Sequence, residues 1–371
     1  MFSFKLSTEL QYFNELPEFI QAFSVNKDDL IVTNEVIYNN SFKKLGTDWN
    51  VLFQEAYGLG EPNDKMINKL LADAAKFKYK RVIAVGGGTV IDIGKLMTLQ
   101  GVTDVLDVMY GKIPVIKDKT LIVLPTTCGT GSEVTNISIL EDTVNKVKKG
   151  IVHQDLFPDI AVLIPELLQG LPFKFFAFSS VDALIHAVES YLAPKSNPVT
   201  ELFGIKAMEM IISTYKEVAA KGQQAAYDNI GNVLLASTYA GIAFGNTGVG
   251  AVHAMSYPLG GKYHVPHGEA NYAFFDAVLR TYEQYNSTGK IVQLKEIITG
   301  ILNLPAGADA LGVLDELINK VTPRKRLREY GMVAEDLNSF TKGALEQERL
   351  MKNNYVSLSS DDVFKIYQSL Y

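Results

Sequence analysis

The stretch RVIAVGGGTVIDIGK at residues 81–95 decides the fold. Its first part is rich in β-branched residues and hardly alternates between apolar and polar side chains, which is typical of a strand buried on both faces. Three glycines follow, and Thr89 then opens a pattern of helical spacing that extends to residue 99. A strand joined to a helix by a short loop is the repeating unit of a parallel sheet with helices packed against it.

The flanking sequence repeats this unit on both sides: residues 64–77 have helical spacing and lie between two predicted strands. From residue 173 onward the alternation stops, and the chain shows almost only helical periodicity. The sequence therefore predicts an α/β domain at residues 1–168 and an all-helical domain at residues 169–371. The other predicted strands are 29–34, 51–58, 120–126 and 159–165.

Composition limits the classes of partner. The 371 residues are 47% hydrophobic and 20% charged, as in folded proteins, and the net charge of -6 argues against binding to nucleic acid. No apolar run approaches the roughly 18 residues of a membrane span. The N-terminus lacks the pattern of a secretion signal, and the single Cys128 agrees with a reducing compartment. We therefore expect a cytoplasmic protein, with no membrane partner, that acts on small molecules.

The glycine loop is a candidate phosphate site. Gly86, Gly87 and Gly88 let backbone amides approach an anion, and the following helix offers unpaired N–H groups at its N-terminus. A tight turn that binds nothing explains the same glycines, and the loop is not the G-x-G-x-x-G fingerprint. A second loop, PTTCGTGSEVT at residues 125–135, also follows a predicted strand, and its hydroxyls suit a nucleotide cofactor. Cys128 in this loop has no predicted base nearby, which favours a packing role.

Histidine spacing indicates a metal site. Asp182 and His186 in DALIHAVESY are four residues apart, and side chains at this spacing share one helix face. His253, His264 and His267 lie in GVGAVHAMSYPLGGKYHVPHGEANY at residues 248–272. One carboxylate with two or three imidazoles suits a divalent first-row metal. A local Asp–His hydrogen bond and histidines that cap helices are the alternative interpretation.

The segments GGGTVIDIGK, TTCGTGSEVT, DALIHAVESY and HAMSYPLGGKYHVPHG, in this order, resemble the iron-containing (group III) alcohol dehydrogenase family over essentially the whole chain. The resemblance implies an N-terminal Rossmann-like dinucleotide domain and a C-terminal helical metal-binding domain. It implies Fe²⁺, or Zn²⁺ as the alternative, on four ligands, which are Asp182, His186, His253 and His267. It implies that NAD contacts Gly86, Gly87, Gly88, Thr89, Thr126, Thr127, Thr135 and Lys148.

Further segments, such as YGLGEP, resemble the NAD-dependent members that interconvert 4-hydroxybutanoate and succinate semialdehyde. We therefore expect this hydride transfer, and a homodimer. Two alternatives share the two-domain plan: an iron- or zinc-dependent dehydrogenase of another small primary alcohol or diol, and a metal-dependent lyase of the dehydroquinate-synthase-like superfamily. A metal-dependent hydrolase or a nucleotide-binding regulatory protein would explain the metal ligands or the glycine loop, but not both.

Two positions depart from the family pattern. Tyr257 stands where many members have a third histidine, proposed to assist proton transfer or to contact nicotinamide. Asn34 stands where NAD-preferring members often have an aspartate that binds the ribose, so the preference for NAD over NADP stays open. A 4-hydroxy acid also needs a donor for its carboxylate. His264 is the first choice, with Lys262 and Tyr257 as alternatives, and His264 and Tyr257 are the candidate catalytic residues.

Overall fold

The computed structural model describes residues 2–46 and 49–371, which fall into two compact units. Leu6–Leu171 form one, here called the α/β unit. Residues 2–5 join Pro172–Tyr371 in the other, the helical unit. The division lies three residues beyond the predicted boundary at 168, and the Leu171 backbone N–H still donates to the Leu168 carbonyl oxygen (3.0 Å). The first residues also belong to the helical unit rather than to the α/β unit.

In the described part of the α/β unit, six strands form one sheet in the order β1-β8-β5-β4-β2-β3, and all neighbours are parallel. The predicted parallel sheet is thus confirmed. The strands are β1 (Glu9–Tyr12), β2 (Asp29–Thr33), β3 (Asn50–Phe53), β4 (Arg81–Gly86), β5 (Thr120–Pro125) and β8 (Ile160–Leu163). The helices are α1 (Leu16–Phe23), α2 (Glu35–Ile37), α3 (Asp64–Ala74), α4 (Gly88–Met97) and α5 (Val105–Met109).

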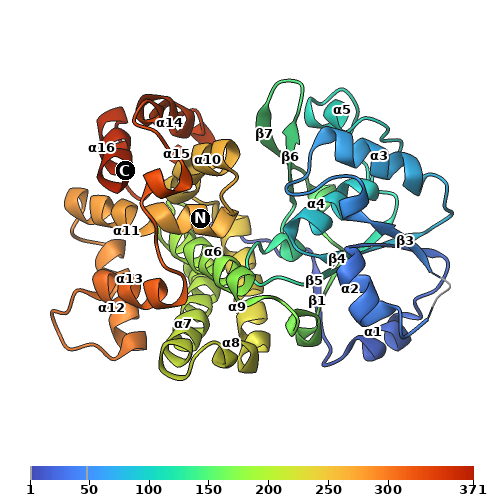
Figure 1. Cartoon of the computed structure of the whole chain (residues 1–371), viewed down its shortest axis with the longest axis horizontal. Coiled ribbons are helices and arrows are strands. Elements are labelled where there is room, and N and C mark those ends of the chain that lie inside the picture. The colour runs from blue at the N-terminus through green and yellow to red at the C-terminus, as the bar shows by residue number, and fades with distance from the viewer. Residues whose placement is uncertain (1, 47–48) are drawn as a thin grey trace. The chain divides into compact units, whose positions relative to one another are not determined.

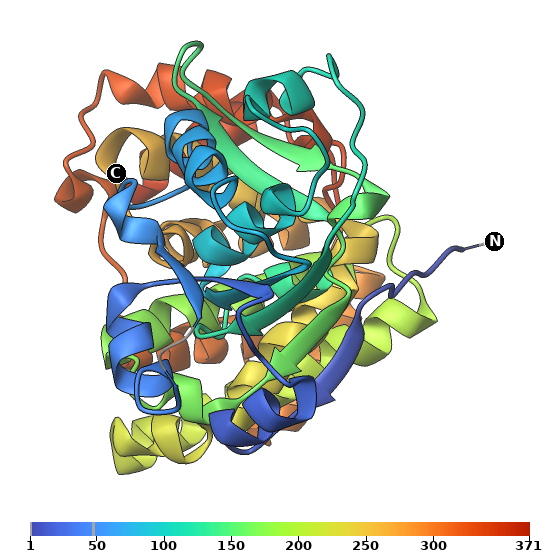
Figure 2. The same cartoon turned by 90° about the vertical axis from the view of Figure 1, so that its right-hand side faces the viewer.

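Both faces of the sheet are buried. Along β4, Val82 and Ala84 pack into the core that includes α3, α4 and α5, whereas Ile83 and Val85 pack into the core that includes α1. Figures 1 and 2 show α1 on one side of the strands and α3 and α4 on the other. Burial on both faces explains why the central strands read as continuous apolar runs.

Four strands differ from the sequence-based prediction, and the first is β1 (Glu9–Tyr12), which no sequence pattern predicted. The predicted strand at 51–58 ends at Phe53 and continues as a 3-10 turn at Gln54–Ala56, where Gln54 Nε2 donates to the Gly58 carbonyl oxygen (2.8 Å). The sequence patterns did not reveal an antiparallel hairpin of β6 (Ile137–Asp142) and β7 (Val147–Val152).

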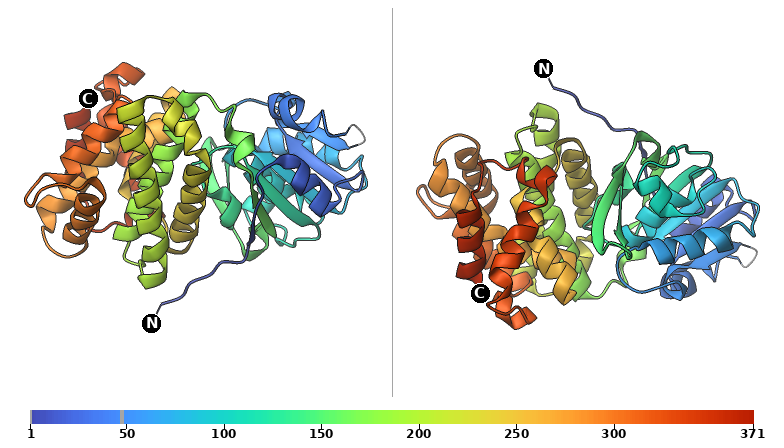
Figure 3. Two further views of the ribbon diagram at one scale, coloured as in Figure 1. Left: turned by 90° about the horizontal axis from the view of Figure 1, so that it is seen from below. Right: turned by 90° about the horizontal axis from the view of Figure 1, so that it is seen from above.

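The helical unit contains no strand among its described residues, as predicted. Almost every residue of α6 from Phe176 to Leu192 is buried, so this helix forms the centre of the unit. Helices α7 and α9 pack against it, and Figure 3 shows the three side by side. No described helix is long and apolar enough to cross a membrane. The helices are α6 (Phe173–Leu192), α7 (Pro198–Lys221), α8 (Gln224–Asp228), α9 (Ile230–Thr247), α10 (Ala251–Tyr263), α11 (His267–Tyr285), α12 (Lys290–Leu302), α13 (Ala310–Val321), α14 (Asp336–Leu345), α15 (Glu348–Met351) and α16 (Ser360–Leu370).

The first residues of the chain are tied to the helical unit. The Lys5 backbone N–H donates to Asn246 Oδ1 (2.7 Å), and Asn246 Nδ2 donates to the Lys5 carbonyl oxygen (3.0 Å). The ring of Phe4 stacks on that of Phe203, with centroids 6.0 Å apart. These contacts explain why the segment before the α/β unit belongs to the helical unit.

Candidate metal centre and nucleotide loop

Helix α6 carries two polar side chains into the core of the helical unit. Asp182 is 3% exposed and His186 is 5% exposed, and the Asp182 Oδ2 lies 3.9 Å from His186 Nδ1. A buried carboxylate is costly unless a cation or hydrogen-bond donors compensate its charge. The two residues share one helix face, as their spacing predicts.

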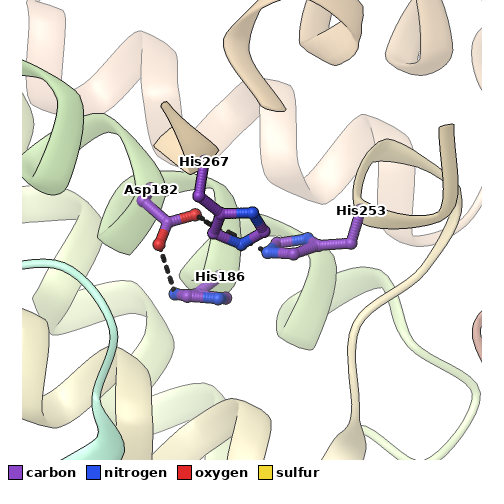
Figure 4. A group of neighbouring side chains, drawn as sticks. All are labelled: Asp182, His186, His253 and His267. Carbon is purple, nitrogen blue, oxygen red and sulfur yellow. Dashed lines mark ion pairs between the residues drawn. The ribbon is translucent and has the colours of Figure 1, made fainter. Parts of the chain in front are cut away.

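Two further imidazoles converge on Asp182 from other helices. His253 comes from α10 and His267 is the first residue of α11. The Nε2 atoms of His253 and His267 lie 3.6 and 3.7 Å from Asp182 Oδ1. Figure 4 shows the four side chains pointing toward one another. One potential ligand atom from each of Asp182, His186, His253 and His267 lies within 4.8 Å of all the others.

The arrangement meets the requirements of a divalent cation site. Separations of 3.6 to 3.9 Å from the carboxylate suit atoms that bind one ion at about 2.0–2.2 Å each. The His253 Nε2 is buried and has no hydrogen-bond partner among the described residues. A buried ring nitrogen aimed at a carboxylate and two other imidazoles therefore fits a metal ligand.

Electrostatics around the group favour positive charge. Burial raises the pKa of Asp182, but the nearby imidazoles of His186, His267 and His253 outweigh it and hold that pKa well below its ordinary value. Burial lowers the pKa of His253, but the carboxylates of Glu189 and Asp182 raise it to about 9. The buried carboxylates thus create a field that attracts a cation.

Sequence reasoning missed two supporting residues. Glu189 is 4% exposed, and its Oε2 lies 2.6 Å from His253 Nδ1 while its Oε1 accepts from the Val252 backbone N–H (2.8 Å). Asn271, fully buried, donates from Nδ2 to Asp182 Oδ1 (2.7 Å). A carboxylate on Nδ1 favours the tautomer whose Nε2 lone pair is available for a metal. Glu189 lies three residues after His186 on the same helix, a spacing that signals a shared face.

A glycine sets how closely α11 approaches α6. A Cβ on Gly268 would overlap the carbonyl oxygen of Phe178, and it would lie 2.8 Å from the Phe178 carbonyl carbon and 3.2 Å from the Asp182 Cβ. Only a residue without a side chain fits at this crossing. Since His267 precedes Gly268 directly, the close packing of the two helices brings its imidazole to Asp182.

Of the candidate substrate-binding residues, Tyr257 lies near His267. The ring centroid of Tyr257, on α10, lies 6.1 Å from that of His267, and Tyr257 is half-buried. His264 is exposed and has a left-handed backbone (φ 54°) where α10 ends. Lys262 Nζ donates to Asp336 Oδ1 (2.5 Å), so its charge is already paired. His264 is not part of the four-residue group.

The glycine loop lies in the α/β unit, at the carboxyl end of β4. Gly86 ends the strand and Gly87 precedes α4, so Thr89 is the second helical residue rather than the first. No described side chain caps the start of α4, which leaves its first backbone N–H groups available for an anion. A Cβ on Gly88 would lie 2.8 Å from the Thr130 side chain, so packing also requires glycine there.

The second loop adjoins the first. The Thr126 backbone N–H donates to the Gly86 carbonyl oxygen (3.0 Å), and a Cβ on Gly87 would lie 3.3 Å from Thr127. Cys128 is fully buried, in line with a packing role. The strands β4 and β5 end at paired residues, which brings both loops to one edge of the sheet.

The remaining candidate cofactor residues also lie in the α/β unit. Thr135 follows the turn Ser132–Val134, and its hydroxyl lies 3.4 Å from the Nζ of Lys95, which is fully buried. Lys148 is on β7 and pairs with Glu61 (2.7 Å). Asn34 directly follows β2.

Comparison with known proteins identifies the family. The sequence model of iron-containing alcohol dehydrogenases matches residues 5–165, and that of the Fe-containing alcohol dehydrogenase family, C-terminal, matches residues 176–371. The chain is 48% identical over 368 residues to a 4-hydroxybutyrate dehydrogenase from Clostridium kluyveri, covering 99% of each chain. It is 32% identical over 322 residues to a long-chain-alcohol dehydrogenase from Geobacillus thermodenitrificans, covering 84% of this chain and 80% of the relative.

Solved structures share the fold. The chain superposes on an iron-containing alcohol dehydrogenase from Thermococcus thioreducens with a TM-score of 0.83 at 25% identity, covering 100% of this chain and 99% of the other. A sulfoacetaldehyde reductase from Bifidobacterium kashiwanohense, in complex with NAD+, gives a TM-score of 0.86 at 21% identity and covers 100% and 98%. With family sequence models matching both halves and a nearly full-length relative at 48% identity, the chain belongs to the iron-containing alcohol dehydrogenase family.

Proposed function

We propose that this protein interconverts 4-hydroxybutanoate and succinate semialdehyde by hydride transfer with NAD(H). The observation that carries this proposal is the 48% identity, over 99% of both chains, to the 4-hydroxybutyrate dehydrogenase of Clostridium kluyveri. Membership of the iron-containing alcohol dehydrogenase family makes the chain an oxidoreductase, which argues against the lyase alternative. Dehydrogenation of another small primary alcohol or diol is the alternative within the family.

Asp182, His186, His253 and His267 would hold the metal, Fe²⁺ or alternatively Zn²⁺. When bound, such an ion supplies a Lewis acid that polarises the reacting oxygen of the substrate. The protein's own contribution is to fix the ligands: Glu189 orients His253 through Nδ1, and Asn271 holds one oxygen of Asp182. Burial of Asp182, His186 and His253 strengthens the electrostatic interactions among them, whereas His267 is partly exposed.

The α/β unit would hold the cofactor. Gly86, Gly87 and Gly88 run from the end of β4 into the first residue of α4, whose start no described side chain caps, and such a loop suits a pyrophosphate. Other candidates lie on this loop, on the second loop, on the hairpin and after β2. These are Thr89, Thr126, Thr127, Thr135, Lys148 and Asn34.

Two residues of the helical unit are proposed to act on the substrate. Tyr257, half-buried beside His267, has a hydroxyl that can hold or pass a proton near the reacting oxygen. His264 is exposed and would donate to the carboxylate of the substrate. Lys262 is a weaker candidate because Asp336 already pairs with it.

We further propose that the protein is a cytoplasmic homodimer. The single cysteine, which rules out an intrachain disulfide, supports a reducing compartment. Size-exclusion chromatography with light scattering measures the oligomeric state directly.

A substrate panel tests the proposed reaction. The purified protein, loaded with Fe²⁺ or with Zn²⁺, is assayed with succinate semialdehyde, butanal and a long-chain aldehyde, each with NADH and NADPH. A charge-assisted hydrogen bond to the carboxylate is worth about 1.5–3 kcal/mol, so succinate semialdehyde should exceed butanal in kcat/KM by about 10- to 150-fold. Higher activity on butanal would favour the alternative alcohol, and no NADH oxidation with any aldehyde would refute dehydrogenase activity.

The role of His264 needs a separate variant. His264→Ala should leave the metal content intact and reduce kcat/KM for succinate semialdehyde far more than for butanal. Equal losses on both substrates would exclude His264 as the carboxylate donor. His253→Ala serves as the contrasting variant, since losing a ligand should lower both metal content and turnover on every substrate.

A further inference from the structure

The residue after β2 leaves the choice between NAD and NADP undecided. In parallel-sheet dinucleotide domains, an acidic side chain near the end of the strand beside the glycine-loop strand accepts a hydrogen bond from the adenosine ribose. The strand beside β4 is β2, and the residue after it is Asn34, which carries no charge. Asn34 alone has no means of repelling the 2′-phosphate of NADP.

A carboxylate from the next strand lies beside Asn34. Thr33, at the end of β2, pairs in register with Phe53, at the end of β3, and with Val85, one residue before the end of β4. The residues that follow these three strands therefore emerge at one edge of the sheet. Glu55 follows β3 and is half-buried there.

Two hydrogen bonds fix the Glu55 carboxylate at this edge. Asn34 Nδ2 donates to Glu55 Oε2 (3.0 Å), and the Glu35 backbone N–H donates to Glu55 Oε1 (2.6 Å). Asn34 Nδ2 also lies 3.2 Å from Gln54 Oε1. Among the described residues, no lysine or arginine forms an ion pair with Glu55, so its charge is not neutralised.

We propose that Glu55 is the residue that selects NAD over NADP in this chain. Each carboxylate oxygen keeps a second lone pair, so Glu55 can accept from a ribose 2′-hydroxyl while still bound by Asn34 and Glu35. Its unpaired negative charge repels a 2′-phosphate. Asn34 is then a positioning residue, whose amide holds the carboxylate of a different strand. This inference rests on the proposed use of a nicotinamide dinucleotide.

Direct binding of the reduced cofactors tests the inference without turnover. NADH and NADPH are titrated into the wild-type protein and into Glu55→Gln, and the dissociation constants are measured from nicotinamide fluorescence. The variant keeps the size of the side chain and removes its charge. The ratio of the NADPH to the NADH dissociation constant should fall by tenfold or more, mainly because NADPH binds more tightly. A ratio unchanged within twofold would overturn the proposal.

A matched variant separates a local effect from a change in net charge. Glu35→Gln removes one negative charge next to Asn34, from a side chain that is exposed. It should leave the ratio within twofold of wild type, and a fall equal to that of Glu55→Gln would overturn the assignment to Glu55. Thermal melting confirms that each variant is folded. If the wild type binds neither cofactor, the proposed function fails; if it binds both equally, only the role of Glu55 fails.

Discussion

Gly268→Ala should disrupt the candidate metal centre by separating α11 from α6. The added Cβ would lie 2.8 Å from the Phe178 carbonyl carbon. An ordinary separation between carbon atoms is about 3.5–4.0 Å, so this contact alone requires the helices to move apart by about 0.7–1.2 Å, and the overlap with the Phe178 carbonyl oxygen requires more. His267, the preceding residue, moves with α11, whereas metal ligands tolerate displacements of only about 0.2 Å. His267 would then no longer reach an ion held by Asp182.

The expected loss has two parts that are measured separately. Overpacking costs about 1–3 kcal/mol, which lowers the Tm of a unit of this size by about 2–12 °C. Metal affinity, measured by competition with a chelator, should fall by about 100-fold or more, since weakening even a supporting contact costs 10- to 100-fold.

Gly300→Ala is the matched control for this experiment. Gly300 lies within α12, and a Cβ there would have no heavy atom within 4 Å. Alanine is the better helix former, so this variant should keep its metal affinity and gain about 0.5–1 kcal/mol of stability. Wild-type metal affinity and Tm in Gly268→Ala would refute the argument that this glycine sets the position of His267.

Three further predictions follow from buried or closely spaced polar groups. Glu189→Gln should weaken metal binding by about 10- to 100-fold because it removes the carboxylate charge beside His253 Nδ1, and chelator competition that shows no change would exclude this supporting role. Lys95→Ala removes the ion-pair partner of buried Asp92, since Lys95 Nζ lies 3.1 Å from Asp92 Oδ1. The free energy of unfolding, measured in urea, should therefore fall by about 3–5 kcal/mol. A fall below about 1 kcal/mol would contradict the importance of the pair. Asn34→Asp places two carboxylates about 3 Å apart and should lower stability by about 1 kcal/mol or more. Adding Glu55→Gln to the Asn34→Asp variant should recover the lost stability, as measured by thermal melting. No recovery would disprove the contact between residues 34 and 55.

The architecture followed from the sequence because its central strands are buried on both faces. The runs at 29–34, 81–87, 120–126 and 159–165 correspond to β2, β4, β5 and β8 within one or two residues at each end. Strand β1 was missed because ELQY is a short edge strand whose residues are exposed or half-buried. The β6–β7 hairpin lies outside the main sheet, and its polar residues interrupt the apolar pattern that marks a buried strand.

The candidate ligands could be predicted from the sequence, whereas the residues that support them could not. Helical spacing joined Asp182 to His186, the segment 248–272 offered three histidines, and the family resemblance selected His253 and His267 from these. Glu189 and Asn271 act only through contacts between helices, since 64 residues separate Glu189 from its histidine partner. Glu55 was hidden by the strand predicted at 51–58, which would have placed it within the sheet rather than just beyond its edge. The roles of the ligands and of the cofactor residues stay predictions.

The anchoring of residues 4 and 5 has a consequence for biosynthesis. The hydrogen bonds between Lys5 and Asn246 join positions 241 residues apart, so the nascent chain must release nearly all of α9 before they can form. Hydrogen bonds between such distant residues close a large loop, which costs conformational entropy. These bonds therefore form later than the local contacts within helices. The α/β unit, whose residues are contiguous, can fold on the ribosome while the first residues still wait for Asn246 and Phe203. Residues 4 and 5, which are synthesised before the whole α/β unit, therefore reach their native place after it.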